Sequence, residues 1–102
     1  MKFNKLVRDK IPELIKSKGL IPVVHIAKNK EYWLRLKEKL AEEVKEFIAD
    51  ENIKELADIL EVLDAIVDYK KFKKNSILSV KNGKAKARGK FKKRIILDET
   101  RK

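Results

Sequence analysis

Two stretches of the sequence, 31–47 and 53–67, repeat apolar residues at every third or fourth position, which is the spacing of an amphipathic helix. The polar segment 50–52 interrupts the pattern between them. Two helices joined by so short a connection are expected to fold back as an antiparallel hairpin with their apolar faces together. We therefore predict an all-α protein with long helices from about Lys30 to Ala49 and from 53 to about Tyr69 or Lys71.

Acidic side chains fall on these apolar faces. At about 100° per residue, Glu43 and Glu55 project into the two stripes, Glu46 and Asp58 lie at their edges, and Glu42 points away. Buried carboxylates repel one another and are costly unless something compensates their charge. Hard divalent cations compensate this charge well, and Mg²⁺ is a hard cation that takes oxygen ligands. The pattern predicts a magnesium site inside a helical bundle.

Two other interpretations of these carboxylates stay open. Asn52 to Glu55 has the spacing of a capping box, so Glu55 could cap its own helix. Glu43 and Glu46 could instead be rim residues paired with Lys39 or Lys45.

The rest of the chain gives weaker signals. Residues 8–19 predict a short helix that stops at Gly19, and 21–27 predict a short strand or extended segment. Residues 76–80 start a further helix, which Asn82-Gly83 should end or kink. The apolar segment 93–99 predicts a short strand.

The chain is strongly but unevenly basic. Its 102 residues have a formal net charge of +11, yet residues 31–68 hold 12 acids and 5 bases. From Tyr69 to Arg94 there are twelve Lys or Arg and no acid. An acidic middle between basic ends suits an anionic ligand that is bridged by cations.

Composition excludes several classes of protein. The length fits one domain, residues 1–102. The absence of cysteine excludes disulfides, thiolate zinc sites and a cysteine nucleophile. We find neither an apolar leader nor a run of membrane-spanning length, so we expect a cytoplasmic protein that does not enter a membrane.

The acidic motifs also resemble a known family. "EEVKE" (42–46) followed by "ELAD" (55–58) resembles the E-E-x-x-E … E-x-x-D signature of the MazG-like all-α nucleotide pyrophosphohydrolases. "NKLVRDKIPELI" (4–15) and "RGKFKKRI" (88–95) resemble a narrower group within it, the phosphoribosyl-ATP pyrophosphohydrolase-like proteins. The resemblance implies a four-helix core completed by oligomerisation, as a homodimer or homotetramer. The residue pattern adds the short extended segments that we expect near the N- and C-termini.

The resemblance further implies an activity and a site. The expected reaction is Mg²⁺-dependent hydrolysis of a nucleoside triphosphate between the α and β phosphates, in nucleotide-pool house-cleaning. Glu43, Glu46, Glu55 and Asp58 are the implied ligands of Mg²⁺, or of Mn²⁺ in its place. We expect Glu46 also to accept the proton of the attacking water. Lys90 departs from the narrower group, which tends to have glycine there.

Phosphate contacts are expected from basic side chains. The sequence has no glycine-rich phosphate loop, and its single histidine, His25, is interpreted as structural. Arg and Lys bind phosphate well. The candidates for substrate binding are Arg8, Lys10, Arg88, Lys93 and Arg94.

Three alternative functions stay open. The basic stretch 69–94, with Phe72 and Phe91 interspersed, could be a non-catalytic nucleic-acid-binding module. The chain could be the phosphoribosyl-ATP pyrophosphohydrolase of histidine biosynthesis. It could also be a helical dimerisation unit indifferent to Mg²⁺.

Overall fold

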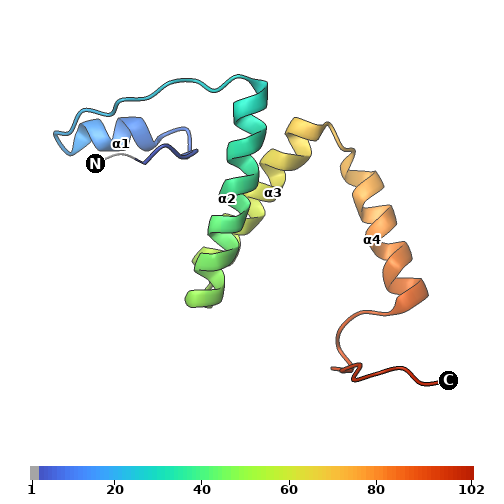
Figure 1. Cartoon of the computed structure of the whole chain (residues 1–102). Coiled ribbons are helices and arrows are strands. Elements are labelled where there is room, and N and C mark those ends of the chain that lie inside the picture. Colours follow the sequence, from blue (N-terminus) through green and yellow to red (C-terminus); the bar gives the residue numbers. More distant parts are fainter. Residues whose placement is uncertain (1–2) are drawn as a thin grey trace. The chain divides into compact units, whose positions relative to one another are not determined.

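A computed structural model describes residues 3–102, and Figure 1 shows the four helices that they form. The helices are α1 (Ile11–Ser17), α2 (Asn29–Ala49), α3 (Ile53–Lys70) and α4 (Lys74–Arg88). No strand occurs in residues 3–102, which confirms the all-α prediction. The chain divides into two units, the first ending at Lys70 and the second spanning Lys71–Lys102. None of the four helices is long and apolar enough to cross a membrane.

The helices α2 and α3 form an antiparallel hairpin, as the apolar pattern predicts (Figure 1). The backbone N–H of Asp50 donates to the Glu46 carbonyl at 2.9 Å and closes the last turn of α2. The Asn52 side chain then accepts a hydrogen bond from the Glu55 backbone N–H at 3.0 Å, which caps the start of α3. These two hydrogen bonds fix the conformation of the short turn at residues 50–52. The turn in turn sets the register of α3 against α2.

Apolar and aromatic contacts hold the hairpin together. Leu36 of α2 and Val62 of α3 are its buried apolar side chains. At the far end from the turn, Trp33 stacks on Tyr69 with ring centroids 5.4 Å apart, and Tyr32 meets Tyr69 edge-on at 5.4 Å. The hairpin is therefore packed at its middle and closed at one end by three aromatic rings.

The N-terminal segment folds largely as expected. Pro12 lies in the first turn of α1, and Gly19 follows the helix with φ of +81°, a conformation that glycine adopts without strain. Residues 20–28 then run without regular structure to α2. His25 Nε2 lies 2.9 Å from Glu31 Oε1, which ties this segment to α2.

Two sequence predictions differ in part from the structure. Residues 93–99 and 21–27 form no strand, because a strand requires a neighbour that neither segment has within the described residues. Asn82-Gly83 does not end the C-terminal helix, since α4 continues to Arg88. One glycine costs a helix only about 1 kcal/mol, and the lysines and alanines after it favour helix.

Candidate metal centre

Three carboxylates gather where α2 faces α3. Glu43 comes from α2, and Glu55 and Asp58 come from successive turns of α3. One oxygen of each carboxylate lies within 4.8 Å of one oxygen of both others. We refer to Glu43, Glu55 and Asp58 as the acidic group. The placement of Glu55 and Asp58 three residues apart gives them the same helix face, and the turn at 50–52 brings Glu43 opposite them.

The acidic group is short of hydrogen-bond partners. Glu43 is only 6% exposed, and Glu55 and Asp58 are half-buried. Glu43 Oε2 and Glu55 Oε2 are buried oxygens that have no hydrogen-bond donor among residues 3–102. Each such buried polar atom costs roughly 1–3 kcal/mol. Carboxylate oxygens from three side chains are the donor set that Mg²⁺ and Mn²⁺ prefer, so the residues present fit a hard divalent cation.

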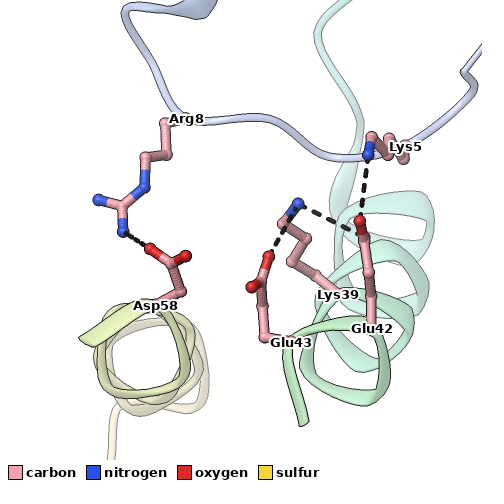
Figure 2. A network of polar contacts seen from close by, with 6 residues as sticks. All are labelled: Lys5, Arg8, Lys39, Glu42, Glu43 and Asp58. Atoms are coloured by element: carbon pink, nitrogen blue, oxygen red, sulfur yellow. Dashed lines mark hydrogen bonds and ion pairs between the residues drawn. The ribbon is translucent and has the colours of Figure 1, made fainter. Parts of the chain in front are cut away.

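Two basic side chains contact members of the acidic group, and Figure 2 shows Lys39 beside Glu43 and Arg8 beside Asp58. Lys39 Nζ lies 3.2 Å from Glu43 Oε1, and Arg8 Nη2 donates to Asp58 Oδ1 at 2.8 Å. Each basic side chain binds only one oxygen of its carboxylate. In Glu43, Lys39 binds Oε1, and Oε2 is the oxygen without a donor among the described residues. The charges of Glu43 and Asp58 are thus partly neutralised, whereas Glu55 has no basic partner among the described ion pairs.

Glu42 extends the network away from the acidic group. Lys39 Nζ also lies 3.4 Å from Glu42 Oε2, and Lys5 Nζ donates to Glu42 Oε1 at 3.1 Å (Figure 2). Burial tends to raise the pKa of the Glu42 carboxyl, but the hydrogen bond from Lys5 and the charge of Lys39 together hold that pKa below its usual value. Glu42 therefore stays ionised and holds both lysines in place.

The structure places the predicted site residues in three different settings. It brings together Glu43, Glu55 and Asp58, but Glu46 is exposed on α2 and lies outside the acidic group. Arg8 reaches Asp58, and also lies 3.8 Å from Glu61, whereas Lys10 is exposed just ahead of α1. The remaining predicted phosphate-binding residues belong to the second unit: Arg88, Lys93 and Arg94.

The structure also bears on the two simpler interpretations. Asn52 does cap α3, but it binds the backbone of Glu55 and leaves the Glu55 carboxylate in the acidic group. Lys39 pairs with Glu43 as that interpretation supposed, yet the pairing uses a buried and not a rim carboxylate. The structure thus combines helix capping and ion pairing with the carboxylate cluster.

Sequence reasoning missed the part played by Lys5 and Glu42. The three-residue spacing from Lys39 to Glu42 is a spacing of helical ion pairs and could have indicated their contact. Lys5 is 37 residues from Glu42, and no local pattern signals such a pair.

Comparison with known proteins finds similarity over part of the chain. A protein of Mycolicibacterium smegmatis described as uncharacterized is 51% identical over 45 residues, which cover 44% of this chain and 46% of that protein. The match thus spans less than half of either sequence. No family model matches the chain, and no solved structure matches it.

Proposed function

We propose that this protein is a Mg²⁺-dependent nucleoside triphosphate pyrophosphohydrolase of the MazG-like, phosphoribosyl-ATP pyrophosphohydrolase-like type. The observation that carries the proposal is the acidic group, in which buried oxygens of Glu43 and Glu55 have no hydrogen-bond donor within the described part of the chain. The "EEVKE" and "ELAD" motifs supply these same residues. The reaction consumes one water and gives a nucleoside monophosphate and pyrophosphate, which suits nucleotide-pool house-cleaning.

The proposed roles follow from position and chemistry. Glu43, Glu55 and Asp58 would hold the cation, which when bound neutralises phosphate charge and lowers the pKa of a water. Glu46 lies one helical turn after Glu43 and is exposed, so its carboxylate can meet water and accept a proton. Arg8, which lies beside Asp58, is positioned to contact a phosphate oxygen.

We also propose that a second copy of the chain completes the helical bundle. Leu56, Leu60 and Leu63 recur at helical spacing along α3 and are 46%, 56% and 39% exposed. A single hairpin leaves this stripe in water, and a homodimer would bury it. Sedimentation equilibrium should give a mass above 11.9 kDa, and Leu60→Lys should shift the protein toward that monomer mass.

Product analysis tests the activity. The purified protein is incubated with a panel of ribo- and deoxyribonucleoside triphosphates and with phosphoribosyl-ATP, with and without Mg²⁺. Metal-dependent release of monophosphate and pyrophosphate from a nucleoside triphosphate supports the proposal. Selective cleavage of phosphoribosyl-ATP would favour the histidine-biosynthesis alternative, and release of single phosphates would contradict the reaction proposed.

Matched carboxylate variants separate the ligand role from the base role. Glu55→Gln should abolish both turnover and the rise in melting temperature that millimolar Mg²⁺ causes by binding the folded state. Glu46→Gln should lower turnover about a hundredfold, the usual size of a general-base contribution, while the thermal response to Mg²⁺ persists. Glu51→Gln, an exposed carboxylate in the turn, is the control. Full activity of Glu55→Gln would exclude the acidic group as the site.

A second candidate function concerns the second unit. Residues 1–70 contain 14 Lys or Arg and 14 Asp or Glu, whereas residues 71–102 contain 13 and 2. The whole net charge of the protein therefore belongs to the second unit, and Phe72 and Phe91 are exposed within it. Lysine-rich surface with exposed aromatic rings suits a single-stranded nucleic acid. Binding to an oligonucleotide that weakens steeply with salt, in the absence of any nucleotide hydrolysis, would favour this function.

A further inference from the structure

We infer that Lys39 and Arg8 are built-in counter-cations of the acidic group, and that they set its affinity for a divalent ion. The inference rests on the proposed metal site and assigns affinity-determining roles to residues outside the ligand set. Both side chains bind a carboxylate that belongs to the group: Lys39 binds Glu43 at 3.2 Å and Arg8 binds Asp58 at 2.8 Å (Figure 2).

The position of Lys39 gives the stronger case. Its side chain is only 17% exposed, and that of Glu43 is 8% exposed, so little water screens the attraction between them. A lysine ammonium that is this desolvated needs negative partners, and Glu42 and Glu43 supply two. Without Lys39, the buried charges of Glu43 and Glu55 would face each other with no positive charge on either.

The electrostatic consequence has a definite sign. A divalent ion held by Glu43, Glu55 and Asp58 would lie close to the ammonium of Lys39 and the guanidinium of Arg8, and like charges repel. The two side chains therefore stabilise the metal-free protein and weaken metal binding. Repelled from the carboxylates, they become free to contact an anion such as a phosphate group, for which both are suited.

Glu42 has the opposite role. It shares Lys39 with Glu43 and so draws part of the lysine charge away from the acidic group. It also anchors Lys5, which ties the N-terminal segment to α2. Loss of the Glu42 charge would leave Lys39 to Glu43 alone, and metal binding should weaken. Glu42, the first acid of the "EEVKE" motif, thus acts as a positioning residue through Lys39 and not as a ligand.

Direct titration with Mn²⁺ tests the inference, with free Mn²⁺ read from its electron paramagnetic resonance signal at fixed ionic strength. Lys39→Met should tighten Mn²⁺ binding roughly tenfold, because one repelling charge is removed, and should lower the melting temperature of the metal-free protein. Lys39→Arg keeps the positive charge, so this variant should bind Mn²⁺ with the same affinity as the unchanged protein. Glu42→Gln should weaken binding. Lys45→Met removes an exposed charge from the same helix and should change neither quantity.

Opposite effects of Lys39→Met and Glu42→Gln would establish the roles assigned here. Weakened binding in both variants would overturn them, because it would mean that both residues merely maintain the local structure. Circular dichroism at 222 nm shows whether each variant keeps its helices, and the weaker binding expected of Glu42→Gln still tests the inference should Lys39→Met unfold. Absence of Mn²⁺ binding by the unchanged protein would overturn the metal site itself. Equal Mn²⁺ affinities in all variants would instead overturn only the roles assigned to Lys39 and Glu42.

Discussion

The two units of this chain use lysine and arginine in opposite ways. In the first unit, positive and negative residues are equal in number, and Lys5, Arg8, Lys39 and Arg35 are all engaged with carboxylates. In the second unit the described residues show one ion pair, between Arg101 and Glu99. Balanced charge can be paired inside a fold, whereas unbalanced charge is available to bind anions from solution. Lysine and arginine therefore stabilise the fold of the first unit through ion pairs, whereas in the second unit they are available to bind anions.

The largest expected effect comes from the core of the first unit. Leu36 is 1% exposed, so Leu36→Ala should lower the free energy of unfolding by about 2–5 kcal/mol through reduced burial and a cavity. Leu78 of α4 is 52% exposed, and Leu78→Ala should cost far less. Urea denaturation of the two variants measures both changes. Equal decreases in the free energy of unfolding would mean that α4 is packed as tightly as α2.

The next effect concerns the free charge of the second unit. Replacement of Lys74, Lys81 and Lys84 by Gln should reduce the slope of log affinity against log salt for a single-stranded oligonucleotide by about 2, at roughly 0.7 for each phosphate that is no longer neutralised. Fluorescence anisotropy over a range of salt concentrations gives the slope. The same charge removed from the first unit, at exposed Lys16, Lys18 and Lys54, is the control and should change the slope less. Equal changes would show that binding follows net charge alone.

A smaller effect is expected at the turn. Asn52→Ala removes the side chain that caps α3 and should lower the free energy of unfolding by about 1 kcal/mol. Asn75→Ala in the first turn of α4 is the matched change in the second unit, where no side chain caps the helix, and should have almost no effect. Thermal unfolding of both variants gives the difference. A neutral Asn52→Ala would show that the turn is held by other contacts.

The smallest effect is pH-dependent. Because the pKa of Glu42 lies below its usual value in the folded protein, its ion pairs stabilise the fold above about pH 4.5 and lose that contribution as pH falls through the folded pKa. Lys5→Met should therefore lower stability at neutral pH, by less than about 1 kcal/mol since the pair is partly exposed. The difference should shrink progressively as the pH falls below about 4.5 and the Glu42 carboxylate takes up its proton. Chemical denaturation over a series of pH values measures it, and a difference that does not shrink would assign the effect to weaker packing.

Much of the helical hairpin was predictable because its information is local. Apolar periodicity predicted the ends of both long helices to within about one residue of the ends in the structure. The helical wheel correctly placed Glu43 inside the packed face. Glu46 shows the limit of the same method: it lies at the border of the stripe, where a small rotation decides between packed and exposed. The wheel gives the direction of a side chain along one helix, but the partner helix decides how wide the packed face is.

The errors arose where the signal was not local. Segment 93–99 has strand-forming residues, but strand formation depends on a neighbour that residue preferences do not reveal. Lys5 and Arg8 could be recognised as basic, but their partners Glu42 and Asp58 are 37 and 50 residues away. Only the folded chain shows that these side chains are engaged with the acidic residues of the hairpin.

The short turn between α2 and α3 has a consequence for the order of folding. Glu43 and Glu55 are only 12 positions apart in the sequence, on either side of a turn fixed by its own backbone and side-chain hydrogen bonds. Closing a loop of about this length takes on the order of 100 ns or less, and local contacts of this kind form early. During synthesis, the acidic group can therefore assemble once α3 has left the ribosome, before the basic second unit has emerged. A cation held there would stabilise a nascent hairpin.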